Sequence, residues 1–128
     1  LATGELGTLK NVIRASLVCM MAGANFIKTS TGKETINATL PVTLVMSRAI
    51  REYFELTEFE VGYKPAGGIS SAKDCLSHMM LLKEELGSRW LNPSLFRVGA
   101  SSLLSDIERQ IEHFSTGKYS SFNRHGIA

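Results

Sequence analysis

The sequence predicts an α/β protein in which short strands and longer helices alternate. Strand-like runs begin near residues 1, 25, 60 and 95, and patterns of helical period separate them. The intervals of 24, 35 and 35 residues match the length of one strand–helix unit in a parallel sheet. We therefore expect about four such units in a row. This pattern alone leaves open whether the helices cover both faces of the sheet or only one.

The first predicted unit begins at the start of the chain. Leu1–Thr3 are predicted as a strand, and a helix is predicted over residues 9–22, ending at Gly23. Residues 25–29 form the second predicted strand. The apolar positions at helical spacing are Leu9, Val12, Ile13, Leu17 and Met20.

A polar loop over residues 30–38 leads into the second predicted helix, from about Thr39 to Leu56. Thr39 is a typical N-cap, and Pro41 falls in the first turn, where its missing N–H group removes no hydrogen bond. The buried stripe is expected at Leu44, Val45, Ile50 and Phe54.

The third predicted unit contains a strand over residues 60–64, which Pro65 ends. A helix then begins at Ser71, runs to about Leu86, and is capped by Gly87.

The fourth predicted unit contains a strand over residues 95–99 and a helix from Ser101 or Ser102 to about Phe114. We therefore assign residues 1–114 to the folded part of the chain and residues 115–128 to a polar tail.

Charge and hydropathy exclude two classes of partner. The 128 residues carry 14 Lys and Arg against 12 Asp and Glu, a formal net charge of +2. Proteins that bind nucleic acid concentrate basic residues on one surface, so nucleic acid is not an expected partner. The longest apolar stretch, residues 15–24, is shorter than the roughly 20 residues of a membrane span, so no membrane association is expected.

The cysteines and the first residues indicate the context of the chain. Cys19 and Cys75 lie far apart in apolar helical patterns, which favours reduced thiols and a cytoplasmic location over a disulfide. The chain does not begin with Met, and Leu1–Thr3 already have the pattern of a strand. We therefore expect a piece of a longer protein.

Two lysines lie at the carboxyl ends of predicted strands. Side chains alternate along a strand, so Lys28 shares a face with Phe26, and Lys64 shares a face with Gly62. If the two strands are neighbours, about 4.8 Å apart, the ammonium groups approach within roughly 6 Å and repel by about 3 kcal/mol at an effective dielectric constant near 20. One amine is then neutral often enough to attack a carbonyl carbon. Either lysine taken alone has a simpler interpretation, as a solvated side chain.

Loops of small residues follow three of the predicted strands, at residues 29–33, 65–68 and 99–102. Backbone N–H groups in such loops approach an anion closely, and helix N-termini favour negative charge. Parallel strands present their carboxyl ends, where α/β folds place their chemistry, at one edge. The loops therefore predict a phosphate pocket beside the lysines.

Other site templates do not fit. Gly32 and Lys33 do not complete a P-loop, because Ile27 stands where the first glycine is required and Glu34 replaces Ser or Thr. No G-x-G-x-x-G motif occurs, so a dinucleotide site has no support. The histidines, which lack the spacing of metal ligands, are His78, His113 and His125. The sequence therefore predicts neither a zinc site nor a dinucleotide site.

Three segments resemble one enzyme family. Residues 26–33 (FIKTSTGK), 62–69 (GYKPAGGI) and 96–103 (FRVGASSL) are similar, in order and spacing, to motifs of the deoxyribose-phosphate aldolases. Residues 2–6 (ATGEL) resemble that family's fifth strand. The resemblance extends from Leu1 to about Phe114. It implies a (β/α)8 TIM barrel, of which this chain carries about four βα units, strands five to eight.

The resemblance also implies an activity. The family are lyases of deoxyribonucleotide catabolism that reversibly cleave 2-deoxy-D-ribose 5-phosphate to D-glyceraldehyde 3-phosphate and acetaldehyde, with no metal or organic cofactor. Lys28 matches the lysine that forms the Schiff base, and Lys64 matches the second lysine that perturbs it. The positions that match the substrate and phosphate site are Thr31, Gly32, Lys33, Gly67, Gly68, Gly99, Ser101 and Ser102.

The chain departs from the family at two positions. Many members carry a basic residue where this chain has Ser70, so phosphate binding is expected to rely more on Lys33 and on backbone donors. The family's tail ends in a tyrosine that reaches the site. Tyr119 or Phe122 is the counterpart here, and we assign no role to either.

A larger departure concerns proton transfer. The family uses an aspartate from its third strand, which a chain of strands five to eight does not contain. Glu5 is the only carboxylate that the sequence places near a strand end on the expected rim, and it has no assigned role.

Two functions stay open at this level. In the first, the chain is the C-terminal half of an aldolase, needs the N-terminal half of the barrel as a partner, and is inactive alone. In the second, it is a catalytically incomplete half-barrel that binds phosphate or assembles with itself, because four strands leave two open edges. Two copies would supply eight strands, so a homo-oligomer is the expected form of this second function.

Overall fold

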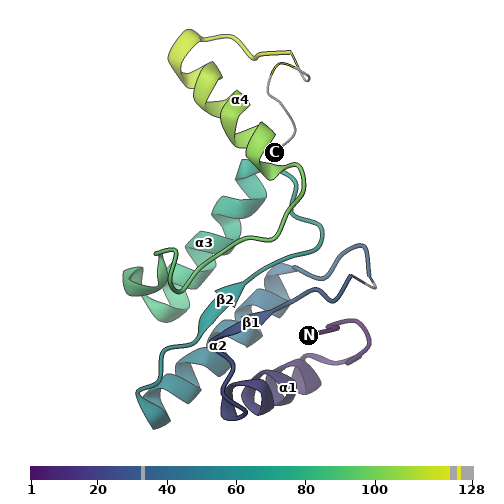
Figure 1. Cartoon of the computed structure of the whole chain (residues 1–128), viewed down its shortest axis with the longest axis vertical. Coiled ribbons are helices and arrows are strands. Elements are labelled where there is room, and N and C mark those ends of the chain that lie inside the picture. Colours follow the sequence, from purple (N-terminus) through teal and green to yellow (C-terminus); the bar gives the residue numbers. More distant parts are fainter. Residues whose placement is uncertain (33, 122–123, 125–128) are drawn as a thin grey trace.

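The computed structural model describes residues 1–32, 34–121 and 124. From α1 to α3, helices and strands alternate in the predicted order (Figure 1). The strands are β1 (Phe26–Lys28) and β2 (Gly62–Lys64). The helices are α1 (Leu9–Met21), α2 (Leu40–Thr57), α3 (Ala72–Leu86), the short 3-10 helix η1 (Ser88–Trp90) and α4 (Leu103–Thr116).

The two strands pair in parallel, with Ile27 opposite Tyr63 and Lys28 opposite Lys64. Helix α2 packs between α1 and α3, while α1 also contacts β1 and α2 contacts β2. These three helices therefore line up in chain order along one side of the strands (Figure 1). Doubly wound sheets place helices on both faces, so this arrangement is the one expected of a barrel wall.

The predicted helix boundaries are largely confirmed. The Thr39 hydroxyl accepts a hydrogen bond from the backbone N–H of Val42 at 3.4 Å and caps α2. Ser71 caps α3 in the same way, and Gly87 follows its last turn. The final helix begins after Ser102 and continues to Thr116, two residues beyond the predicted end.

The fourth predicted strand is present only in part. Residues 95–99 lie beside β2 but form two isolated parallel bridges instead of a regular strand. The backbone hydrogen bonds run from Tyr63 to Leu95 (2.8 Å), from Arg97 to Tyr63 (3.1 Å) and from Gly99 to Pro65 (2.9 Å). In a regular parallel ladder the N–H of residue 65 would donate the next hydrogen bond, but proline has no N–H group. Pro65 therefore interrupts the pairing midway.

The prediction of a first strand at Leu1–Thr3 is wrong. A turn begins at Thr3, and the N–H of Leu6 donates to the carbonyl of Ala2 at 3.1 Å. In the described part of the chain, one hydrogen bond joins this segment to the sheet, from the nitrogen of Leu1 to the carbonyl of Lys28 at 2.6 Å. The turn closed by the hydrogen bond between Leu6 and Ala2 replaces strand pairing here.

The main core lies between the helices and the outer face of the strands. Ile27 and Tyr63 project into it and are 2% and 0% exposed. The buried face of α2 differs from the prediction, because Leu44, Val45 and Phe54 are only half-buried. The residues of α2 that are fully buried are Thr43, Met46, Ser47, Ala49 and Ile50. Two polar side chains thus occupy core positions, which hydrophobic periodicity does not predict.

Two sequence-based expectations concern the cysteines and the membrane. Cys75 is buried, Cys19 is half-buried, and both are free thiols. Within the described residues, none of the helices combines the length and the apolar character required to cross a lipid bilayer.

Candidate active site

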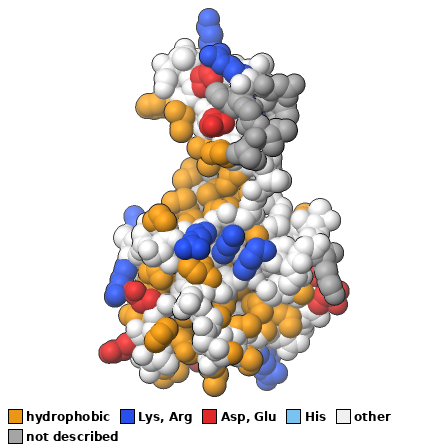
Figure 2. Space-filling model, viewed as in Figure 1, with side chains coloured by type: hydrophobic (Ala, Val, Ile, Leu, Met, Phe, Trp, Pro, Cys, Tyr) orange, Lys and Arg blue, Asp and Glu red, His pale blue; other side chains and the backbone are white. Residues whose placement is uncertain are grey.

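The two lysines lie directly opposite one another, as the sequence predicts. Lys28 and Lys64 are Cα partners in the parallel ladder of β1 and β2. Their neighbours Ile27 and Tyr63 point into the core, so alternation turns both lysines to the face that α1, α2 and α3 leave uncovered. Figure 2 shows Lys and Arg side chains grouped across the middle of the molecule, where Figure 1 shows the two strands.

Each lysine has a defined environment, and both side chains are half-buried. The Lys28 Nζ donates a hydrogen bond to the carbonyl of Ser30 at 2.5 Å, which turns the amine back toward its own loop. Lys64 passes over Gly99: a Cβ added to this glycine would lie 3.4 Å from the Lys64 Cε and 2.7 Å from the Cβ of Ala66. Glycine at position 99 therefore avoids a clash with Ala66, and the Lys64 side chain lies within ordinary contact distance of the same position.

A third cation lies on the same face, farther from the carboxyl ends of the strands. The Phe26 ring covers Gly62, where an added Cβ would collide with the ring. The Arg97 guanidinium lies 4.4 Å from the centroid of the Phe26 ring, a cation–π contact. Sequence reasoning did not single out Arg97, which alternates with Phe96, the bridge partner of the buried Tyr63.

Hydrogen bonds tie together the loops that follow β1 and β2. The Thr29 hydroxyl donates to the carbonyl of Ala66 at 2.7 Å and accepts from the N–H of the same residue at 2.9 Å. The N–H groups of Asn37 and Ala38 both donate to the carbonyl of Gly67, at 3.2 and 3.0 Å. The loop of residues 29–38 is therefore fastened to the loop of residues 65–68 at both of its ends.

The predicted phosphate positions lie on these loops and on the one after residue 98. Gly67 and Gly68 have φ angles of 94° and 91°, which side chains other than glycine rarely adopt. A parallel bridge between Ala66 and Gly99 brings the loop after residue 98 beside the glycine pair. The exposed members are Thr31, Gly32, Gly68, Ser101 and Ser102, together with Ser70. Lys33 lies outside the described residues.

The N-termini of α3 and α4 differ in whether side chains of the protein already accept hydrogen bonds from their backbone N–H groups. In α3, the Asp106 carboxylate accepts from the N–H of Ala72 at 2.7 Å, and the Ser71 hydroxyl accepts from the N–H of Asp74 at 3.1 Å. The same hydroxyl donates to the Asp74 carboxylate and holds its pKa below the usual value. Ser102, the N-cap of α4, makes no side-chain capping bond. The start of α4 is therefore the helix end better suited to receive an anion.

A carboxylate that sequence reasoning missed lies between distant segments. Glu34 accepts a hydrogen bond from the N–H of Gly4 at 3.1 Å and another from the side-chain amide of Asn37. Asn37 also donates to the Thr3 hydroxyl at 3.2 Å. Glu5, which the sequence places near a strand end, is exposed in the turn. The expectation that Glu5 is the only carboxylate near this rim is therefore wrong. Sequence reasoning missed Glu34 because its contact with Gly4 joins residues 30 positions apart.

A chain of buried polar side chains lies behind β2. The Tyr63 hydroxyl is 2.8 Å from the Thr43 hydroxyl, which is itself 2.8 Å from Nδ1 of His78. Burial raises the pKa of Tyr63 and lowers that of His78, while the nearby Asp74 carboxylate and a hydrogen bond with the backbone of Ala38 partly offset the shift at His78. Both rings are therefore held in their neutral forms near pH 7.

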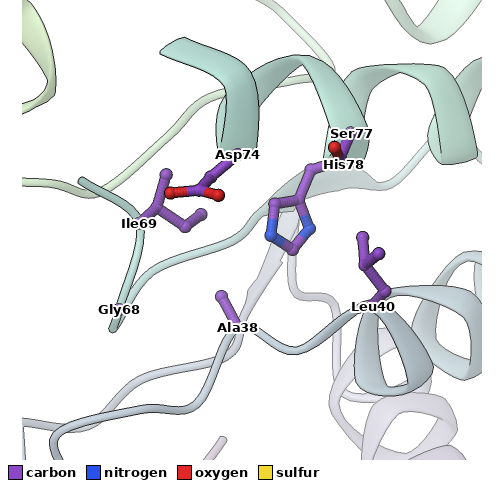
Figure 3. Close-up of a pocket in the computed structure, with 7 residues that line it drawn as sticks. All are labelled: Ala38, Leu40, Gly68, Ile69, Asp74, Ser77 and His78. Carbon is purple, nitrogen blue, oxygen red and sulfur yellow. The ribbon is translucent and has the colours of Figure 1, made fainter. Parts of the chain in front are cut away.

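His78 borders a small pocket at the start of α2 and α3. Figure 3 shows its ring directed from α3 toward the chain segment that carries Ala38 and Leu40, with Asp74 one turn away on the same helix. The pocket encloses about 210 Å³, and Gly68 lies on its wall.

Two remaining expectations concern the tail and metals. Tyr119 stacks on His113 of α4, with ring centroids 3.9 Å apart. Phe122 and His125 lie outside the described residues. Among the residues that are described, no three His, Cys, Asp or Glu side chains form a group that could hold a metal ion.

Comparison with known proteins places the chain in a family. The sequence profile of the DeoC/LacD family aldolases matches residues 3–106. The chain belongs to the DeoC/LacD aldolase family. The deoxyribose-phosphate aldolase of Homo sapiens is 65% identical over 123 residues, which cover 96% of this chain and 39% of the human one. The deoxyribose-phosphate aldolase of Agrobacterium fabrum is 43% identical over 107 residues, 84% of this chain and 40% of its own.

A solved structure agrees with this assignment. A protein of Toxoplasma gondii ME49, described as a candidate deoxyribose-phosphate aldolase, superposes with a TM-score of 0.73 at 25% identity. The superposition covers 94% of this DeoC/LacD chain and 46% of the other. The TIM-barrel prediction is therefore confirmed, and the chain forms part of such a barrel. It spans less than half the length of the relatives that it matches.

We predict that Thr29→Val destabilises the protein, whereas Thr29→Ser does not. Thr29 is fully buried, and valine has its shape without its hydroxyl. The substitution leaves the N–H and carbonyl of Ala66 unpaired, at a cost of roughly 1–3 kcal/mol for each group. Chemical denaturation measures the free energy of unfolding. Equal stability of the valine and serine variants would contradict the proposed connection between the loops.

We predict that the His78 ring titrates below pH 6.5, its usual value. Burial disfavours the imidazolium, so the folded protein binds this proton less readily than the unfolded chain. The contribution of His78 to stability is therefore complete above pH 6.5 and declines as the pH falls below it. An NMR titration of the ring protons gives the midpoint directly. A midpoint above 6.5 would show that the ring gains more from Asp74 and Ala38 than it loses by burial.

Proposed function

We propose that this chain is the C-terminal half of a deoxyribose-phosphate aldolase barrel, and that Lys28 forms the Schiff base. The proposal rests above all on Lys28 and Lys64, which lie opposite each other in register on the uncovered face of the sheet. They stand at the carboxyl ends of the strands, where barrel enzymes carry their chemistry. The similarity to deoxyribose-phosphate aldolases over 96% of the chain supports the same function.

The reaction proceeds through covalent catalysis at Lys28. Its amine attacks C1 of open-chain 2-deoxy-D-ribose 5-phosphate, and loss of water gives an iminium ion. The C2–C3 bond then breaks as the C3 hydroxyl loses its proton, which releases D-glyceraldehyde 3-phosphate. The electron pair of the broken bond is held as an enamine. Protonation at C2 and hydrolysis release acetaldehyde and restore the lysine.

Lys64 assists the attack of Lys28 electrostatically. It places a second cation on the residue directly opposite the nucleophile. The hydrogen bond from Lys28 to the carbonyl of Ser30 holds the amine in place before substrate binds and breaks when the amine attacks. Lys64 is thus assigned to electrostatic activation of Lys28.

The substrate phosphate binds to the loops at the same rim. Gly67 and Gly68 expose backbone N–H groups beside Gly99, and the start of α4 at Ser101–Ser102 adds the favourable end of a helix dipole. Thr31, Gly32 and Lys33 complete the site from the loop after β1. No cofactor is required, because the lysine iminium itself accepts the electron pair.

The rest of the barrel supplies what this chain lacks. The family's proton-transfer aspartate belongs to the third strand, and the chain spans 39% of the human relative. We therefore propose that activity requires the N-terminal half of the barrel and that the chain alone does not turn over substrate. The free thiols of Cys19 and Cys75 fit a cytoplasmic enzyme.

A second candidate function is self-assembly of the half-barrel. Among the described residues, the outer edge of β1 is paired through the nitrogen of Leu1 alone, so its remaining backbone groups are available to another strand. Two copies of this chain would then close a barrel across their open edges. Mass measurement in solution separates the candidates, because self-assembly gives twice the mass of one chain.

We predict that borohydride in the presence of substrate traps a covalent adduct on Lys28. The suitable protein is a chimaera in which this chain replaces the matching 123 residues of the human relative, which supplies the rest of the barrel. Reduction converts the iminium into a stable secondary amine, and peptide mass spectrometry locates it. Lys28→Arg, which keeps the charge, serves as the control and should give no adduct. Labelling at Lys64 instead would reverse the two assignments.

We predict that Lys64→Leu in the same chimaera slows cleavage at pH 7 by on the order of 100-fold. The substitution removes the cation opposite the nucleophile. Lys64→Arg retains a cation at this position and should preserve the rate better than leucine. An unchanged rate in the leucine variant would contradict electrostatic activation.

A further inference from the structure

The buried chain Tyr63–Thr43–His78 connects the two ends of the proposed active site. Tyr63 is the residue before Lys64 in β2, and its hydroxyl contacts Thr43 in the first turn of α2. Thr43 in turn contacts His78 of α3. Tyr63 and Thr43 are 0% exposed, and His78 is 4% exposed. Three polar side chains thus occupy positions where a barrel core normally holds apolar ones.

The hydrogen bonds that link Tyr63, Thr43 and His78 run in one direction when every one of these groups has a hydrogen-bond partner. The neutral imidazole accepts at Nδ1 from the Thr43 hydroxyl, which leaves the Thr43 oxygen to accept from the Tyr63 hydroxyl. The ring's other nitrogen then carries the proton, and Ala38 lines the same pocket as His78. Figure 3 shows the ring directed toward this segment.

Ala38 carries the connection into the phosphate loop. Its N–H donates to the carbonyl of Gly67 at 3.0 Å, and that of Asn37 donates to the same oxygen at 3.2 Å. An added Cβ on Gly67 would lie 3.0 Å from Oδ1 of Asn37, so the two loops are also in close contact. A shift of Ala38 therefore moves Gly67 and the following Gly68.

We propose that His78 is a positioning residue that sets the distance between the strand bearing the lysines and the loop that binds the substrate phosphate. The inference rests on the function proposed above. His78 touches no reacting atom. It acts through Thr43 and Tyr63 on one side and through Ala38 and Gly67 on the other.

This role predicts a particular kinetic effect. A misplaced phosphate loop weakens binding of a phosphorylated substrate, but it has no effect on a sugar that carries no phosphate. Loss of the His78 connection should therefore reduce the preference of the enzyme for 2-deoxyribose 5-phosphate over 2-deoxyribose. A residue that only filled the core would affect both substrates equally.

The test uses the chimaera described above with the variant His78→Phe. We expect KM for 2-deoxyribose 5-phosphate to rise on the order of tenfold, with kcat nearly unchanged, and kcat/KM for 2-deoxyribose to stay within about twofold. His78→Gln keeps an amide donor near Ala38 and should recover most of the preference. Ser77→Ala alters the adjacent residue, whose hydroxyl bonds only within α3 to the carbonyl of Lys73, and should leave both substrates unaffected.

Two isosteric variants keep the test decisive if His78→Phe does not fold. Thr43→Val and Tyr63→Phe each remove one hydroxyl from the chain with little change in volume, and each should lower the preference for phosphate in the same direction. An unchanged ratio of kcat/KM values in folded variants would overturn the positioning role. Failure of the proposed function is seen separately, because the unsubstituted chimaera would then give no adduct on Lys28.

Discussion

The alternation of side chains along β1 and β2 determines the rest of this structure. Ile27 and Tyr63 face the helices and are almost completely buried, so Lys28 and Lys64 must face the opposite way. A slip of one residue would bury the lysines and expose the core residues, which fixes the register. The placement of two like charges on opposite residues, unfavourable in itself, is thus imposed by the burial of the residues beside them.

Polar contacts over long sequence distances then build a rigid rim on this short sheet. Thr29 joins the end of β1 to Ala66, and Asn37 and Ala38 share the carbonyl of Gly67. Each of these contacts satisfies a backbone group that has no strand partner, since regular pairing stops at Lys64. The loops are therefore ordered by the Thr29 side chain and by backbone hydrogen bonds between them, in place of a longer ladder.

The uncovered face shows why this chain is suited to be part of a larger barrel. Lys28, Lys64 and Arg97 lie on a surface that, in a complete TIM barrel, faces the opposite strands. Relatives of more than twice its length have the residues to provide those strands. The active site proposed here is thus shared between segments, with the nucleophile on one and the proton-transfer group on another.

The sequence by itself determined the order of the elements, the caps at Thr39 and Ser71, and the shared face of the two lysines, because these depend on local periodicity and on residues a few positions apart. Only the tertiary structure decided that the helices cover one face and that Pro65 interrupts the last strand pair. It also brought Glu34 to Gly4 and His78 to Thr43. These contacts join residues at least 30 positions apart, and no local pattern records which distant backbone or side-chain group will satisfy a buried polar atom.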